Sequence, residues 1–443
     1  MKRLVPIVVV FGIVLIFDLN SARADRPLPY QAADVHLGVT SCAGSTCHGS
    51  TIERSSNVEQ NEYLVWSDDE EPDLHFIAYE VLFSDESERI AKNLGLESAH
   101  TAEICLACHT DYVAEGVRGD KFTVEDGVGC EACHGGGERY LEPHYQQGAT
   151  HQNNLDLGLY PTEDPAARAS LCLSCHFGNQ DKFVTHRIMG AGHPRMSFEL
   201  DTFTADQPAH YFIDDDYEQR KQFWDGVQTW AIGQTIAARH LVDAINAGGK
   251  TGLFPELTLF DCHSCHHSMK DLRWRPKDKV PLAPGSLRLN DAHLLMTYQL
   301  SRVVSPELTS DIRDAIRAMH QSVQQSQDAL SSAAVTLKGL LDRMTTRLAE
   351  HSFNSDDMYQ LIDGFVDDGL RGEYSDYAAA EQSLMAIGSI LAALEEADAF
   401  DEKRGDTLFG ALDSVFDTLG DEDRFSSAGF QNALKTFLQV VRS

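Results

Sequence analysis

Four stretches of the sequence carry two cysteines separated by two residues, with a histidine directly after the second cysteine. In this spacing the two thiols can form thioether bonds to the two vinyl groups of one porphyrin, and the histidine lies under the iron as its ligand. Zinc sites also use such cysteine pairs, but they do not require a histidine after every second cysteine. We therefore predict four covalently attached haem c groups. Their thioether cysteines are Cys105, Cys108, Cys130, Cys133, Cys172, Cys175, Cys262 and Cys265, and their ligands are His109, His134, His176 and His266.

A fifth cysteine pair departs from this spacing. Cys42 and Cys47 are separated by four residues, and His48 follows Cys47. This stretch has three interpretations: a haem site with a longer loop, half of a metal site, or a small disulfide loop. His48 stands where the other four motifs have their ligand, and Gly44 with its small neighbours makes the longer loop easy to fold. The stretch therefore favours a fifth haem, with a Cys42–Cys47 disulfide as the alternative.

The chain has 19 histidines, more than the motifs use. Low-spin electron-transfer haems usually take a second histidine each. Glycines near the last two candidates allow a close approach of backbone to a flat macrocycle. The predicted sixth ligands are His36, His75, His144, His186 and His193. His240 is the main reserve, and His100, His151, His210, His263 and His267 are weaker candidates. The spacing does not fix which of these histidines serves which haem.

The N-terminus has the features of a secretory signal peptide. Lys2 and Arg3 precede an apolar run of 14 residues from Leu4 to Phe17, and Ala22-Arg23-Ala24 offers a cleavage site. A membrane anchor is the alternative, but a spanning helix needs about 20 apolar residues. We expect a signal peptide over residues 1–24 and a periplasmic protein that is soluble after cleavage.

The chain is strongly acidic, with a formal net charge of −32. Such a surface repels nucleic acid and favours a basic partner, although solubility alone also explains it. We expect redox proteins as partners, either basic ones or membrane-bound ones linked to quinol. The oligomeric state is not determined by the sequence.

The five motifs all lie between residues 42 and 266. About 50 residues per haem are too few for a conventional core around each one, so the porphyrins must supply much of the core. A helical pattern covers 217–247, and from residue 290 onward apolar residues recur at helical spacing. One helix is expected to start at Ser305-Pro306 and continue past residue 340, followed by helices over 355–370, 375–398, 402–419 and 426–442. We predict a mainly α protein, with a pentahaem domain over 25–285 of short helices and loops and a haem-free helical bundle over 286–443.

Residues 36–270 resemble the cytochrome c-554-type family of multihaem cytochromes. The resemblance rests on LHFIAYEVL followed by LACHT, on GVGCEACHGGGERYLEPH, and on LSCHFGNQDKFVTHRIMGAGHPRMSFELDTFT. It implies a periplasmic electron carrier, with His75, His144, His186 and His193 as the sixth ligands. The longer Cys42–His48 loop and the helical extension are departures from the family's pattern.

Two functions remain open at this point. The first is an exported, pentahaem c-type cytochrome that relays electrons between redox partners, in which the haem carries the electron and the protein tunes it. The second is an oxidoreductase that acts on a small nitrogen or sulfur species at a haem with an open coordination position. The sequence contains no Cys-x-x-Cys-Lys motif, which is typical of pentahaem nitrite reductases, so an electron-transfer protein is favoured over an enzyme.

Overall fold

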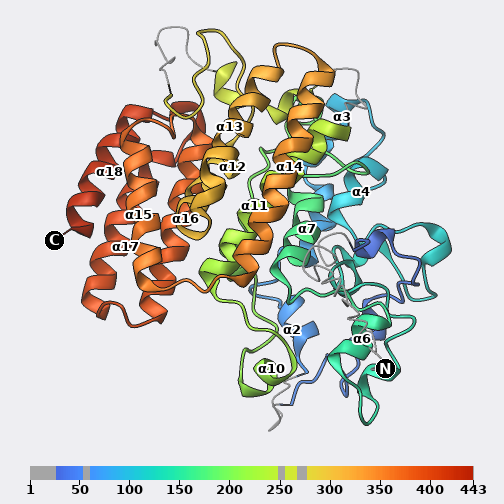
Figure 1. Cartoon of the computed structure of the whole chain (residues 1–443). Coiled ribbons are helices and arrows are strands. Elements are labelled where there is room, and N and C mark those ends of the chain that lie inside the picture. The colour runs from blue at the N-terminus through green and yellow to red at the C-terminus, as the bar shows by residue number, and fades with distance from the viewer. Residues whose placement is uncertain (1–25, 53–59, 248–254, 267–276, 443) are drawn as a thin grey trace, which may run out of the picture.

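The computed structural model describes residues 26–52, 60–247, 255–266 and 277–442. The described residues form helices joined by loops, and the only β structure among them consists of isolated bridges (Figure 1). The prediction of a mainly α protein is therefore confirmed. The expected signal peptide over 1–24 lies outside the described residues.

The first half of the chain contains short helices, and three of them carry the cysteine motifs. Its α-helices are α2 (Glu62–Trp66), α3 (Asp85–Leu94), α4 (Glu103–His109), α5 (Cys130–His134), α6 (His151–Asp156), α7 (Pro165–His176), α8 (His186–Ala191), α9 (Leu200–Asp206) and α10 (Asp215–Arg220). Its 3-10 turns are η1 (Pro29–Gln31), η2 (Val39–Ser41), η3 (Phe76–Ala78), η4 (Glu80–Phe83), η5 (Glu115–Val117), η6 (Val124–Asp126) and η7 (Pro143–Tyr145). Short helices and loops were expected here, because this region has too few residues to bury separate cores.

Helix α11 (Gly226–Ala247) lies at the centre of the molecule (Figure 1). It is shorter than the helix predicted over 217–247, because α10 ends at Arg220 and a loop separates the two. Most of α11 is buried, and it packs on α7 and α9 as well as on the C-terminal helices. One hydrophobic cluster runs from Leu173 through α11 to Phe437. The domain boundary at residues 285 and 286 stays a prediction, and the apolar core is continuous across it.

The C-terminal part is a bundle of long amphipathic helices, as expected. Turns η8 (Leu257–Leu259) and η9 (Cys262–Ser264) lead into α12 (Ala292–Val304), α13 (Pro306–Ser322), α14 (Gln327–Glu350), α15 (Ser355–Leu370), α16 (Tyr377–Glu396), α17 (Glu402–Phe416), η10 (Asp417–Leu419), η11 (Glu422–Arg424) and α18 (Ser427–Val441). The single helix expected from residue 305 to beyond 340 is two helices. The Ser326 side chain accepts a hydrogen bond from the Ala329 N–H and so caps a new helix at that point.

Helix α16 is long and apolar enough to cross a membrane by length and composition. In the structure 67% of its most apolar window is buried inside the protein. It packs against α11, α12, α15 and α17. Its apolar surface is thus accounted for by the core of the bundle.

Candidate haem-binding sites

Three of the motif histidines stand at the last residue of a helix. Helix α4 ends at His109, α5 at His134 and α7 at His176. Residues i, i+3 and i+4 of a helix share one face, so both cysteines and the histidine of each motif point to the same side. One flat group could therefore bond to both thiols while its centre lies against the imidazole.

The Cys262 and Cys42 motifs reach a similar arrangement through turns. The His266 N–H donates to the Cys262 carbonyl at 2.7 Å, as in one turn of helix. The His48 N–H donates to the Cys42 carbonyl at 3.2 Å, so the same bond spans a loop that is two residues longer. The extra residues between Cys42 and Cys47 are accommodated within this wider turn.

Four motif histidines face a second histidine at a nearly constant distance. Histidine–metal bonds are about 2 Å long and the ring centroid lies about 1 Å behind the ligating nitrogen, so two histidines on opposite sides of one metal have centroids about 6 Å apart. The observed centroid separations are 6.1 Å for His48 and His144, 6.2 Å for His176 and His75, 6.3 Å for His134 and His210, and 6.0 Å for His266 and His186. Each pair is thus spaced as the two axial ligands of a single iron would be.

The fifth motif histidine, His109, has His193 as its neighbour. Burial lowers the pKa of His109, and the charge of His193 lowers this pKa further, against the effect of the Ala78 carbonyl. Four motif histidines therefore have a second histidine at a centroid distance near 6 Å, and His109 has His193 within electrostatic reach.

Hydrogen bonds hold the Nδ1 atom of several of these histidines. A histidine whose Nδ1 is engaged presents Nε2 to a metal in a fixed orientation. The Nδ1 bonds are His48 to Glu62 at 3.0 Å, His75 to Asp73 at 2.9 Å, His109 to the Ala78 carbonyl at 2.9 Å, His144 to the Leu141 carbonyl at 2.5 Å, and His193 to the Pro194 carbonyl at 2.9 Å. These residues fit the role of haem ligands.

Other histidines have their Nε2 atom engaged instead. His151 bonds Glu163 at 2.8 Å, His263 the Glu422 carbonyl at 3.2 Å, and His351 Asp357 at 3.1 Å, each through Nε2. The Nε2 atom of His320 lies 3.0 Å from Asp291 inside the bundle. This nitrogen is already used in these residues, which separates them from the paired histidines.

His36 is buried away from the histidine pairs. Its Nδ1 lies 2.7 Å from Asp111, and no ring contact with a motif histidine is found for it in the described part of the chain. Burial works to lower the pKa of His36, but the hydrogen bond and charge of Asp111, together with the charge of Glu131, raise it. The structure thus brings three of the five predicted sixth ligands, His75, His144 and His186, into ring contact with a motif histidine. His193 acts electrostatically on His109. His210, a weaker candidate, lies beside His134, whereas His36 lies beside Asp111.

Thiols of different motifs lie against each other. The Cys42 and Cys130 thiols interact, which lowers the pKa of Cys42 and raises that of Cys130, and Cys175 and Cys108 affect each other in the same way. All ten cysteines are free thiols in the structure. The first and third motifs therefore meet at their cysteines, and so do the second and fourth.

Residues 41–135 match the family model described as cytochrome c554 and c-prime. The match contains the Cys42, Cys105 and Cys130 motifs, and it confirms the predicted resemblance over this segment. No match was found among curated proteins or among solved structures. This segment is therefore similar to c-type cytochromes, a class of proteins that bind haem c covalently and transfer electrons.

The pKa values of two buried motif histidines fit haem ligation. Burial lowers the pKa of His134 to about 4, with smaller contributions from His210 and Lys221. His176 likewise has its pKa lowered by burial and by His75. A metal needs the neutral imidazole, and burial maintains that form at neutral pH.

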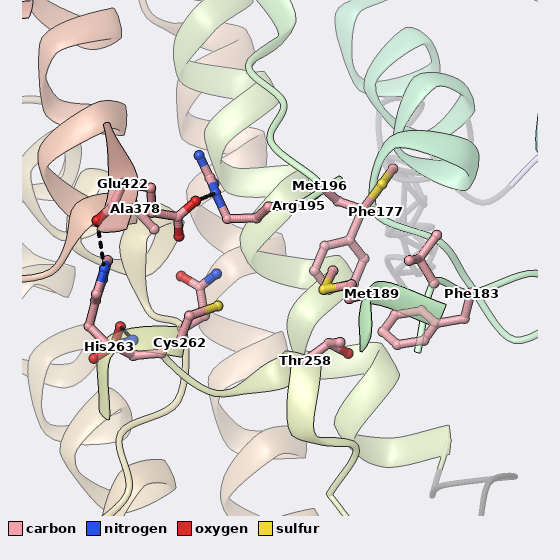
Figure 2. Close-up of a pocket in the computed structure, with 13 residues that line it drawn as sticks. Phe177, Phe183, Met189, Arg195, Met196, Thr258, Cys262, His263, Ala378 and Glu422 are labelled. Atoms are coloured by element: carbon pink, nitrogen blue, oxygen red, sulfur yellow. Dashed lines mark hydrogen bonds and ion pairs between the residues drawn. The ribbon is translucent and has the colours of Figure 1, made fainter. Parts of the chain in front are cut away.

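The last cysteine motif opens into a cavity between the two halves of the chain. Figure 2 shows Arg195 and His263 reaching Glu422 on one side of this cavity and Phe177 with Phe183 on the other. Arg195 pairs with Glu422 at 2.9 Å and with Glu381 at 2.8 Å. Both carboxylates belong to the C-terminal part. The helical extension therefore forms one wall of the space beside Cys262.

His210 was only a weak candidate in the sequence, although its context carries a signal. It follows Pro208 by two residues and precedes Tyr211, much as His144 follows Pro143 and precedes Tyr145. His134 and His210 are 76 positions apart in the sequence, and nothing local indicates that they pair. Only the folded chain brings the two rings together.

Proposed function

We propose that this protein is an exported pentahaem c-type cytochrome that relays electrons between redox partners in the periplasm. The observation that carries the proposal is the set of four histidine pairs whose ring centroids lie near 6 Å from each other, each at a different cysteine motif. Haem c bound at these sites supplies one-electron chemistry, and the chain supplies its thioether bonds, its axial ligands and its surroundings.

We propose the axial pairs His48 with His144, His109 with His193, His134 with His210, His176 with His75, and His266 with His186. The separations near 6 Å support four of them, and the mutual electrostatic influence of His109 and His193 supports the other. The assignment leaves His36 to a structural role with Asp111. It also makes Cys42–His48 a haem site rather than a disulfide loop.

The pairs also bear on the alternative, an oxidoreductase for a small nitrogen or sulfur species. Such an enzyme needs an iron with one open position for its substrate. Four motif histidines have a second histidine at the separation expected for two ligands of one iron, and with His193 as the proposed second ligand at His109, ten histidines would fill both axial positions of five haems. This favours a carrier over an enzyme.

Contacts between motifs support a relay. The Cys42–Cys130 and Cys108–Cys175 contacts place four of the motifs in two pairs. Burial raises the pKa of Cys133, and the charge of Cys172 raises it further, so Cys133 of one pair lies near Cys172 of the other. Groups attached at these cysteines would have their edges close together. A periplasmic location rests on the predicted signal peptide and on the family resemblance.

The spin state of the iron tests the proposal. We expect EPR and optical spectra of the oxidised and reduced holoprotein to contain only low-spin haem, with no change on adding cyanide or nitric oxide. A high-spin haem that binds either ligand, together with turnover of nitrite or hydroxylamine, would favour the enzyme instead. Haem stoichiometry from the pyridine haemochrome gives an independent count of five.

A further inference from the structure

Lys182 lies at the meeting point of two cysteine motifs. Its Nζ atom is 3.0 Å from the Cys175 sulfur and 2.8 Å from the Ala107 carbonyl oxygen. Ala107 is inside the Cys105–His109 motif, and Cys175 belongs to the Cys172–His176 motif. One ammonium group therefore contacts both motifs where the Cys108 and Cys175 thiols also touch.

A tight turn directs Lys182 toward this point. The Asn179 side-chain oxygen accepts the N–H groups of Asp181 and Lys182, at 2.9 and 3.2 Å, and the Asn179 N–H donates to the Lys182 carbonyl at 2.7 Å. Gly178 begins the turn with φ of +102°, a conformation that favours glycine. The position of the ammonium is thus built into the backbone and is not a free surface arrangement.

Tyr30 covers the ammonium from the outside. The Lys182 nitrogen lies 4.5 Å from the centre of the Tyr30 ring, within the range of a cation–π contact. The Tyr30 hydroxyl accepts from Asn179 at 2.7 Å and donates to Asp181 at 3.1 Å, which fixes the ring. The Asp181 carboxylate thereby bonds to Tyr30 and Gln31, and the Lys182 ammonium contacts a carbonyl, a sulfur and a ring.

A fixed positive charge changes the redox equilibrium of a group beside it. Reduction adds an electron to a haem, and a nearby cation stabilises the reduced form more strongly where water is excluded. The overall charge of this chain, −32, acts in the opposite direction on every haem. A cation held against two motifs therefore gives the haems at those motifs higher reduction potentials than they would otherwise have.

We propose that Lys182 is an electrostatic tuning residue, which raises the reduction potentials of the haems attached at Cys105–His109 and Cys172–His176. The inference rests on the proposed function, because it requires haem at both motifs. With Lys182 in place, these two haems would be easier to reduce than they would be without its charge.

The test compares the full-length holoprotein with its Lys182→Met and Lys182→Arg variants in a spectroelectrochemical titration. Methionine keeps the length of the side chain and removes its charge, whereas arginine keeps the charge. We expect Lys182→Met to lower two of the five midpoint potentials, with a change of about tenfold in each reduction equilibrium constant, or about 59 mV for one electron. Lys182→Arg should keep both potentials close to the wild-type values.

An Asp181→Asn variant provides a second measurement if the Lys182→Met protein does not fold with its haems attached. Removing this carboxylate should raise the same two potentials, by less than tenfold because Asp181 is exposed. Five unchanged potentials in both charge variants, or an equal fall in Lys182→Met and Lys182→Arg, would overturn the tuning role. A wild-type protein without haem on the Cys105 or Cys172 peptides, seen by mass spectrometry, would instead contradict the proposed function itself.

Discussion

The imidazole rings of His134 and His210 lie 6.3 Å apart, centroid to centroid, with their planes perpendicular. His134 ends helix α5, and His210 lies in the loop between α9 and α10. This separation matches the about 6 Å expected for two ligands on opposite sides of one metal. It assigns to the third motif a partner that the sequence ranked low.

Replacing His210 with alanine should convert one low-spin haem to a high-spin haem. The change removes the second nitrogen ligand, while the thioether bonds through Cys130 and Cys133 keep the haem attached. We expect the EPR spectrum to gain a high-spin signal for one iron in five and the optical spectrum to respond to cyanide.

The matched control is His36→Gln. His36 lies with Asp111 and not against a motif histidine, so this variant should keep five low-spin haems and lose only stability. The reverse outcome, a high-spin haem in His36→Gln and none in His210→Ala, would show that the two histidines have been assigned the wrong way round.

Removing the Arg195 side chain should weaken the attachment of the motif region to the C-terminal bundle. Arg195 contacts Glu381, Glu422 and, through its guanidinium at 5.0 Å, the ring of Tyr377. An Arg195→Met variant leaves two carboxylates without their counter-ion, which should cost about 2 kcal/mol for these partly buried groups. Guanidinium unfolding of the holoprotein measures this loss.

Arg424→Met is the control for that experiment. Arg424 pairs with Asp421 at 3.2 Å on the surface, and its side chain is 87% exposed. We expect a change within about 0.5 kcal/mol. Equal losses of stability in the two variants would mean that Arg195 has no special role between the two halves.

Glu199 should make stability fall as the pH rises. Its carboxylate caps helix α9 by accepting the N–H groups of Asp201 and Thr202 at 2.8 Å, and burial raises its pKa from 4.5 to about 7. Between these values the folded protein retains a proton that the unfolded chain has lost. The contribution of Glu199 is therefore fully present below about pH 4.5 and declines as the pH increases through about 7.

A Glu199→Gln variant removes this titration. From pH 4.5 to 7 the free energy of unfolding of the wild type should fall relative to that of Glu199→Gln, by up to about 3 kcal/mol. The exposed Glu402→Gln substitution, at the start of α17, should give no such difference. A difference between wild type and Glu199→Gln that stays constant over this range would contradict the raised pKa.

Local signals in the sequence predicted much of the fold. Helices α15, α16 and α18 lie within two residues of their expected bounds, because their apolar residues recur at helical spacing. The break at Ser326 cannot be read from this spacing, because the apolar pattern continues on both sides of it. The motifs at Cys105, Cys130, Cys172 and Cys262 could be recognised because haem attachment requires a short, fixed spacing.

Long-range relationships could not be read in the same way. The pairing of His134 with His210, and the contact of Lys182 with Ala107 and Cys175, join residues that local patterns treat separately. The continuity of the core through α11 depends on how helices pack, since the same amphipathic pattern would serve two separate domains. These features follow from tertiary structure, and the sequence indicated only the residue types involved.

The number of covalently bound haems tests the central claim most directly. Intact-mass spectrometry of the exported holoprotein should show five additions of about 616 Da to the mature chain, and peptide mapping should place one of them on Cys42 and Cys47. Four additions, with Cys42 and Cys47 joined as a disulfide, would contradict the account of the first motif and of the His48–His144 pair.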